Sequence, residues 1–149
     1  MISLLVINGP NLNMLGIRQP EVYGRDTLPG IETLCREHAQ TRNVGCEVFQ
    51  SNHEGALIDQ IHAARGSHHG IILNAGAYTH TSIAIMDAVA SASVPTIEVH
   101  LSNIHARESF RHTSYLSKVA VGQICGFGAH GYVLAIDALI AHLAEAETA

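Results

Sequence analysis

Short runs rich in β-branched residues alternate along this chain with longer stretches in which apolar residues have helical spacing. This alternation is typical of βαβ units and predicts a parallel sheet with helices on both faces. The predicted strands cover residues 2–7, 44–49, 70–74, 95–99 and 119–125, and the predicted helices cover 27–42, 54–66, 80–92 and 129–145. The order of the elements therefore places the chain in the α/β class.

The length of the chain limits how many such units can share a core. With 149 residues, 47% of them hydrophobic, the chain can bury one good core, so we expect a single domain, residues 1–149. Five strands and four crossover helices in this length predict a flavodoxin-like three-layer sandwich with a five-stranded parallel sheet. We expect the strand order 2-1-3-4-5, although periodicity alone does not supply it.

Charge and apolar patterning exclude several classes of partner. The formal charge is −5 and basic residues are spread along the chain, so we expect no nucleic-acid partner. No apolar run approaches the roughly 20 residues of a membrane span, so we expect no membrane partner. The first residues lack the pattern of a signal peptide, and the three cysteines lack metal-ligand spacing. We therefore expect a reducing, cytoplasmic location.

The segment that follows the first predicted strand has an unusual composition. Residues 9–24 read GPNLNMLGIRQPEVYG and carry Asn11, Arg18 and Tyr23. In an open parallel sheet, ligands bind at the carboxyl ends of the strands. We interpret this segment as a catalytic loop, because its glycines and prolines shape the backbone without giving it a core of its own.

Polar residues also follow the third and fourth predicted strands. Asn74 ends the third strand, and His80 lies at the predicted start of a helix, where an anionic or hydroxylated ligand could bind. A helix cap with a tight turn is the alternative for this segment. Glu98 and His100 are two residues apart in a strand, so their side chains share one face. A carboxylate beside an imidazole prepares it for proton transfer, although a purely structural pair is equally compatible with this spacing.

Further candidates for ligand contact come directly after the fourth strand. Leu101 and Ser102 offer backbone amides and a hydroxyl. Arg107 and Arg111 are four residues apart, on one face if the segment is helical, and they suit carboxylate recognition. A solvated basic face is the alternative interpretation of this arginine pair.

The available residue types narrow the chemistry. Lys118 is the only lysine and has no obvious partner to keep its amine unprotonated, so a Schiff-base route is disfavoured. No metal-ligand template is present, and we expect no metal and no cofactor. Tyr23 could act as a base if nearby arginines lower its pKa, asparagines and water could stabilise an enolate, and His100 could protonate a leaving hydroxyl. The candidate reaction is elimination of water from a hydroxyketone that carries a carboxylate.

Five segments in a fixed order resemble one family over nearly the whole chain. They are GPNLNMLGIRQPEVYG, SNHEGALIDQIHAARG, NAGAYTHTSIAIMDA, VPTIEVHLSNIHARESFRHTSYLS and GFGAHGY, and they resemble type II 3-dehydroquinate dehydratase. The resemblance implies a hydro-lyase that converts 3-dehydroquinate to 3-dehydroshikimate by anti elimination through an enolate, without metal or imine. Such a reaction serves the shikimate pathway to aromatic amino acids, or quinate breakdown.

The resemblance also implies roles for individual residues. Tyr23 would be the proton acceptor, Arg18 the lid arginine, and Asn11 the residue that holds the water stabilising the enolate. His100 would be the proton donor and Glu98 its orienting partner. The implied substrate contacts are Asn74, His80, Asp87, Leu101, Ser102 and Arg111.

The family further implies a homododecamer, a tetramer of trimers, in which Asp87 reaches a neighbouring subunit's site. The chain departs from the family pattern at Ala75, Met86, Ala56 and Gln60. Met86 stands where arginine often precedes the aspartate, which could weaken contacts around Asp87. The alternative function is a non-catalytic flavodoxin-like ligand-binding paralogue. Against it, residues 9–24 lack the Ser/Thr/Gly-rich phosphate loop of a flavodoxin.

Overall fold

A parallel sheet forms the middle layer of the protein. The computed structural model describes residues 1–17, 21 and 26–148. Its strands are β1 (Ser3–Asn8), β2 (Gly45–Gln50), β3 (Gly70–Asn74), β4 (Thr96–His100) and β5 (Gly122–Cys125). All four pairings are parallel and the order is β2-β1-β3-β4-β5, which confirms the predicted topology.

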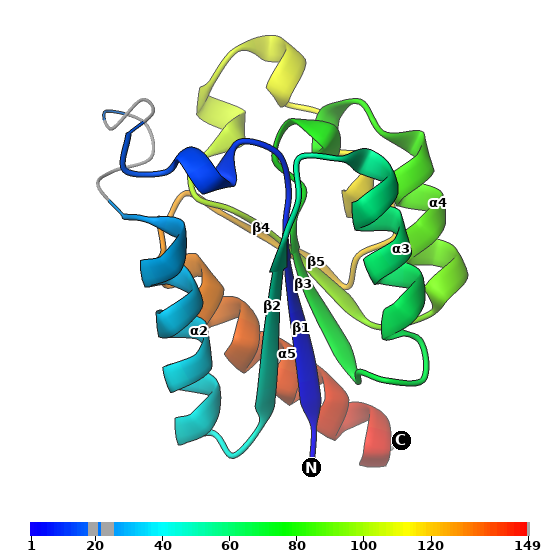
Figure 1. Ribbon diagram of the computed structural model, residues 1–149. Helices are drawn as coiled ribbons and strands as arrows, with labels where there is room; N and C mark the ends of the chain where they lie inside the picture. Colours follow the sequence, from blue (N-terminus) through cyan, green and yellow to red (C-terminus); the bar gives the residue numbers. More distant parts are fainter. Residues whose placement is uncertain (18–20, 22–25, 149) are drawn as a thin grey trace.

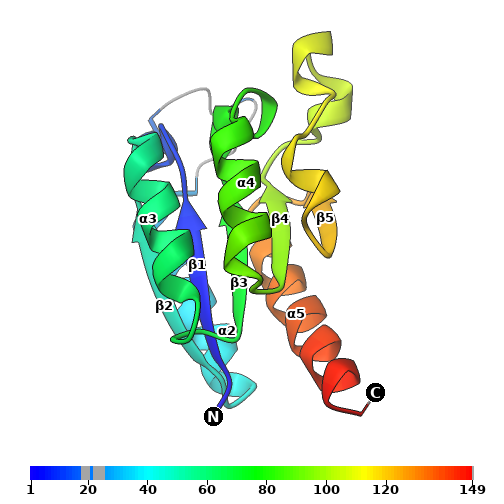
Figure 2. The same cartoon turned by 90° about the vertical axis from the view of Figure 1, so that its right-hand side faces the viewer.

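Helices cover both faces of this sheet (Figures 1 and 2). One face carries α2 (Leu28–Thr41) and α5 (His130–Thr148), and the other carries α3 (Glu54–Ala64) and α4 (Ile83–Ala92). Side chains of β1 alternate between the two layers: Leu4 and Val6 pack in the cluster that includes α2 and α5, whereas Leu5 and Ile7 pack in the cluster that includes α3 and α4. A strand buried on both faces is typical of a flavodoxin-like sandwich, as the apolar runs predicted.

Helix starts follow local capping chemistry, with one correction to the predicted boundaries. Thr27 caps α2 by accepting a hydrogen bond from the backbone N–H of Gly30. The third predicted helix begins at Ile83 and not at residue 80, and its cap is the Ser82 hydroxyl, which accepts from Ile85 N–H at 2.9 Å. Residues 76–80 instead form a short 3-10 helix, so His80 ends this turn and does not open α4.

The last strand is shorter than predicted. It begins at Gly122 and not at residue 119, because Leu116–Lys118 form a 3-10 turn whose carbonyl at Leu116 accepts the N–H groups of Val119 and Ala120. Val119 packs against the α3–α4 cluster from this turn. An apolar side chain can therefore be buried here without belonging to the sheet.

Four short 3-10 helices gather at the carboxyl edge of the sheet, at the top of Figure 1. They are η1 (Leu12–Met14), η2 (Gly76–His80), η3 (Ile104–Ala106) and η4 (Ser109–Arg111). They follow β1, β3 and β4, the strands whose ends carry the polar candidates. Among the described residues, no helix is long and apolar enough to cross a membrane.

Candidate active site

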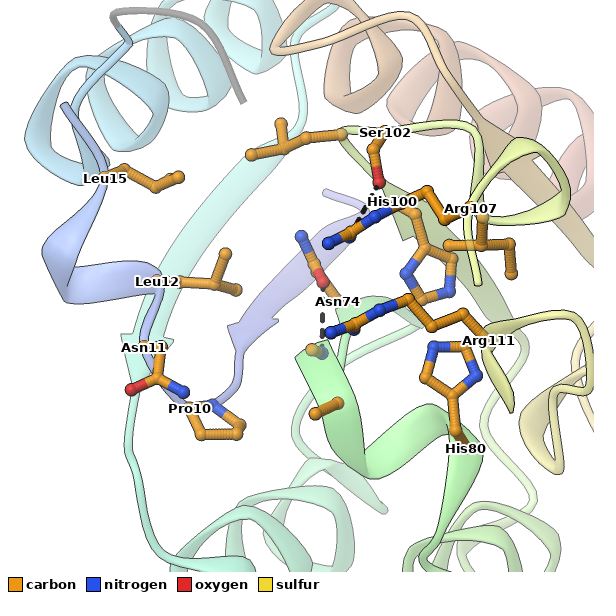
Figure 3. Close-up of a pocket in the computed structure, with 14 residues that line it drawn as sticks. Pro10, Asn11, Leu12, Leu15, Asn74, His80, His100, Ser102, Arg107 and Arg111 are labelled. Carbon is orange, nitrogen blue, oxygen red and sulfur yellow. Dashed lines mark hydrogen bonds between the residues drawn. The ribbon is translucent and has the colours of Figure 1, made fainter. Parts of the chain in front are cut away.

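An open pocket lies at the carboxyl ends of β1, β3 and β4 (Figure 3). Its empty space is about 570 Å³, a volume that includes open solvent at the mouth. The pocket is lined by Pro10, Asn11, Leu12, Leu15, Asn74, Gly76, Ala77, His80, His100, Leu101, Ser102, Ile104, Arg107 and Arg111. Eight of the candidates from the sequence therefore share one cavity: Asn11, Asn74, His80, His100, Leu101, Ser102, Arg107 and Arg111.

Asn11 lies on the η1 side of the pocket, opposite the histidines and arginines (Figure 3). Its backbone is in the left-handed region, with φ at 68°, a conformation that asparagine tolerates better than most residues. The side-chain oxygen of Asn52, which follows β2, accepts the Asn11 N–H at 2.9 Å. Gln50 Nε2 donates to the same oxygen at 3.2 Å. The end of β2 thus holds the first turn of the candidate catalytic loop.

His100 and Glu98 form a buried pair beside the pocket. In the pair, His100 Nε2 is 2.5 Å from Glu98 Oε2, and the glutamate side chain is fully buried. The two residues therefore share one face of β4, as their spacing predicted. Since Nε2 is occupied by the carboxylate, Nδ1 is the ring nitrogen left for a ligand.

Hydrogen bonds keep Glu98 ionised despite its burial. Burial acts to raise the pKa of this carboxyl, but the hydrogen bond and electrostatic attraction of His100, with hydrogen bonds from Ser114 and Gln123, outweigh it and hold the pKa below its usual value. The Ser114 hydroxyl lies 2.9 and 2.8 Å from the two carboxylate oxygens. The imidazole of His100 consequently has a fixed anionic partner at neutral pH.

The second pocket histidine, His80, stacks on His100. The ring centroids are 6.3 Å apart and the planes are inclined by 20°. Its Nδ1 lies 2.8 Å from the carbonyl oxygen of Thr113, so this nitrogen carries a proton and Nε2 is the other ring nitrogen. Burial lowers the pKa of His80, with smaller contributions from the neighbouring His100 and Arg111, although the bond to Thr113 opposes the shift. A neutral His80 is thereby favoured.

Two arginines supply the positive charge of the pocket. Arg107 and Arg111 do not lie on one helix, because the segment forms two separate 3-10 turns, yet both side chains line the cavity (Figure 3). Arg107 donates to the Ser102 hydroxyl at 3.3 Å, and Arg111 Nε donates to Glu108 at 3.1 Å. With side chains only 15% and 19% exposed, they do not form a solvated basic face. The described pocket lining contains both arginines and no acidic side chain, which suits a carboxylate ligand.

One predicted site residue lies away from the pocket, and two are not among the residues that the structure describes. Asp87 is exposed on α4 and is not among the described residues that line the pocket. Arg18 and Tyr23 fall outside the described residues, so their roles stay predictions from the sequence. Among the described side chains, no group of three or more histidine, cysteine or acidic residues is arranged to hold a metal ion.

The sequence did not predict the residues that hydrogen-bond to the site residues without lining the pocket. Ser114 and Gln123 reach Glu98 from distant parts of the chain, and no local spacing indicates these contacts. Asn52 lies in the segment SNHEGALIDQIHAARG, which is part of the family resemblance. No local pattern indicated that its side-chain oxygen accepts the backbone N–H of Asn11. Arg107 was a candidate from its spacing, although the family resemblance assigned a contact to Arg111 only.

Known proteins resemble this chain in both sequence and structure. Residues 2–140 match the family described as Dehydroquinase class II. A 3-dehydroquinate dehydratase from Dinoroseobacter shibae is 66% identical over 98% of this chain and 97% of its own length. One from Ruegeria pomeroyi is 64% identical over 96% of both chains. The crystal structure of a type II dehydroquinase from Butyrivibrio crossotus superposes with a TM-score of 0.92 at 49% identity, covering 93% of this chain and 97% of the other.

These matches span the whole fold and not one motif. The family match runs from β1 into α5 and includes every described residue of the pocket. The relatives are matched over nearly their full length, so the likeness is not confined to a shared sheet. The chain belongs to the class II dehydroquinase family.

Proposed function

We propose that this chain catalyses the dehydration of 3-dehydroquinate to 3-dehydroshikimate. The observation that carries the proposal is the buried Glu98–His100 pair, whose histidine lines the pocket. Among the described residues of the same lining, Arg107 and Arg111 supply positive charge and no acidic side chain is present. A pocket of this kind joins a proton donor to a carboxylate site, which are two of the functions that the reaction needs. Family membership supplies the substrate: the full-length relatives are named 3-dehydroquinate dehydratases.

In the proposed mechanism, a base removes a proton from the carbon beside the ketone, and the electron pair moves onto the carbonyl oxygen as an enolate. When the enolate collapses, a carbon–carbon double bond forms, the carbon–oxygen bond to the hydroxyl breaks, and His100 Nδ1 gives its proton to the departing oxygen. Glu98 holds Nε2 of the same ring, which stabilises the imidazolium before transfer. We assign the base to Tyr23 and the charge that lowers its pKa to Arg18.

The remaining pocket residues bind the substrate in this proposal. Asn11 holds the water that stabilises the enolate. Arg111 pairs with the substrate carboxylate, while Asn74, His80, Ser102 and the backbone N–H of Leu101 contact its oxygens. Arg107 holds the Ser102 hydroxyl in the pocket.

The proposed step uses neither a metal, a cofactor nor an imine. An imine would require a lysine amine in contact with the substrate ketone. Lys118, the only lysine of the chain, is exposed in the turn before β5 and does not line the pocket. The substrate carbonyl would therefore stay a ketone until the enolate forms.

We further propose that the chain acts as one catalytic domain in the cytoplasm and assembles as a tetramer of trimers. Several large apolar side chains are exposed, including Ile83 at 53%, Phe110 at 65% and Phe127 at 62%. Burial of these side chains between subunits would remove their apolar surface from water. Asp87 is exposed on α4 and is not among the described residues that line its own pocket, so it would serve a neighbouring subunit. Light scattering should give about twelve times the 15.9 kDa chain mass, and a monomer or trimer mass would refute the dodecamer.

The function is tested by adding 3-dehydroquinate and following the absorbance of the conjugated enone product. We expect turnover by the wild type and its loss in Tyr23→Phe, with the circular dichroism spectrum unchanged. Borohydride added with substrate should leave activity intact, because no imine forms. An inactive wild type would overturn the proposed function, and inactivation by borohydride would redirect the mechanism to Lys118.

A further inference from the structure

Three polar side chains meet inside the core directly behind the pocket. Asn8 ends β1, Asn74 ends β3, and Tyr132 lies in the first turn of α5. Asn8 and Tyr132 are fully buried and Asn74 is 2% exposed. Asn74 is the only one of the three that lines the pocket described above, where its amide lies between the η1 side and the arginines (Figure 3).

The hydrogen bonds of this cluster can run in only one direction. The backbone N–H of Gly76 is a donor, so the Asn74 atom facing it at 3.2 Å must be Oδ1. Nδ2 of Asn74 then faces the Tyr132 hydroxyl at 2.9 Å and donates to it. The hydroxyl has a single proton, and it goes to Asn8 Oδ1 at 2.5 Å. The hydroxyl thus accepts from one asparagine and donates to the other.

The hydroxyl of Tyr132 is not required to fill the core. The ring packs with Ile136, Leu139 and other apolar residues of the α2–α5 layer, and a phenylalanine ring would occupy the same space. Burying a hydroxyl is unfavourable unless it is hydrogen-bonded. Burial raises the pKa of Tyr132 well above its usual value, so the group stays protonated and keeps its role as donor to Asn8. The placement of this oxygen between two asparagines therefore calls for a role beyond packing.

We propose that Tyr132 is a positioning residue for the substrate site, acting through the Asn74 amide. It fixes the amide so that the second N–H of Nδ2 and the remaining lone pair of Oδ1 are left for a ligand hydroxyl or carboxylate. The proposal rests on the proposed function for the identity of the ligand. It also gives a role to the GFGAHGY segment, whose backbone N–H groups at Gly126 and Gly128 bind the carbonyls of His100 and Leu101. The start of α5 is thereby tied to the end of β4 as well as to β1 and β3.

The test is a double-mutant cycle with Tyr132→Phe, Asn74→Ala and the double variant, assayed on 3-dehydroquinate. Loss of the Tyr132 hydroxyl should raise KM roughly 10-fold and change kcat little, because the amide contacts the substrate before and during reaction alike. In the Asn74→Ala background, Tyr132→Phe should change kcat/KM by less than about 2-fold, since there is no amide left to orient. The matched control is Ile136→Val, one turn further along α5, which trims the same buried layer without removing a hydrogen bond.

A purely structural role for the hydroxyl would give a different pattern. Tyr132→Phe would then lower kcat/KM equally in both backgrounds, or only in parallel with the melting temperature as Ile136→Val does, and either result overturns the proposal. Asn8→Ala is the second variant should Tyr132→Phe fail to fold, because it keeps the tyrosine and removes only the acceptor of its proton. Its effect on KM should be in the same direction and should also vanish without Asn74.

Binding separates this inference from the proposed function. The same cycle is measured with quinate, a cyclic polyol carboxylate that lacks the ketone, by isothermal titration calorimetry. A wild type that binds quinate but does not turn over 3-dehydroquinate would refute the proposed function, and the cycle in Kd would still decide the role of Tyr132. A wild type that neither reacts nor binds would overturn both.

Discussion

Replacing Glu98 by glutamine removes the charge behind the proposed acid while keeping the size of the side chain. In the variant, the amide oxygen can still accept from His100 Nε2, and the Ser114 hydroxyl can rotate to accept from the new amide N–H. Hydrogen bonds to a charged group contribute about 1.5–3 kcal/mol and neutral ones about 0.5–1.5 kcal/mol. The imidazolium of His100 should therefore lose about 1–2 kcal/mol of stabilisation in Glu98→Gln.

That loss should be visible in the rate of the reaction. Since 1.4 kcal/mol corresponds to tenfold, kcat on 3-dehydroquinate should fall about 5- to 30-fold. The assay is initial enone formation between pH 5 and 10, with urea unfolding to verify the fold. Glu37→Gln is the matched control, because it removes an exposed glutamate on α2.

Two results would refute this reasoning. One is a Glu98→Gln enzyme with kcat within twofold of the wild type. The other is an equal loss of activity when Glu98→Gln is made in a His100→Gln background, because the carboxylate would then not act through the imidazole.

Three further perturbations test other parts of the site. Arg111→Gln should raise KM for 3-dehydroquinate about 10- to 100-fold with kcat less affected, because a carboxylate contact is lost in ground and transition states alike; an unchanged KM would remove Arg111 from the site. Gly9→Ala should destabilise the fold by about 1–3 kcal/mol in urea unfolding, because the added Cβ would lie 2.5 Å from the backbone oxygen of Ala75; wild-type stability would contradict that close approach. His80→Gln should flatten the decline of stability as pH falls from about 6.5 to 5, because burial lowers the folded-state pKa of His80 and the unfolded chain binds the proton first; parallel curves would show that His80 does not contribute.

The sheet and its helices could be predicted because their patterns are local. Apolar runs located all five strands, whereas the order β2-β1-β3-β4-β5 is one of two common doubly wound orders, and periodicity alone did not select it. The predicted start of α4 was wrong because three neighbouring residues could each cap the helix. Thr79, Thr81 and Ser82 are all plausible caps, and the structure uses Ser82, whose hydroxyl also bonds Glu54 on α3. Such a tertiary contact has no counterpart in local spacing.

The candidate site could also be predicted only in part. Residues at strand ends, such as Asn74 and His100, could be placed together because parallel strands bring their carboxyl ends to one edge. Their supporting partners could not. The Tyr132 hydroxyl bonds Asn8 across 124 positions of the chain, and Ser114 reaches Glu98 across 16. These pairings depend on how helices and loops pack against the sheet, which periodicity does not encode.

The most direct test of the account uses 3-dehydroquinate carrying deuterium at the position beside the ketone that lies anti to the leaving hydroxyl. A base on the Tyr23 loop and an acid on β4 acting from opposite faces predict that the label is lost to solvent, so the 3-dehydroshikimate formed has the mass of unlabelled product. Product that retains the deuterium would contradict anti elimination, and the absence of any product would contradict the assigned reaction itself.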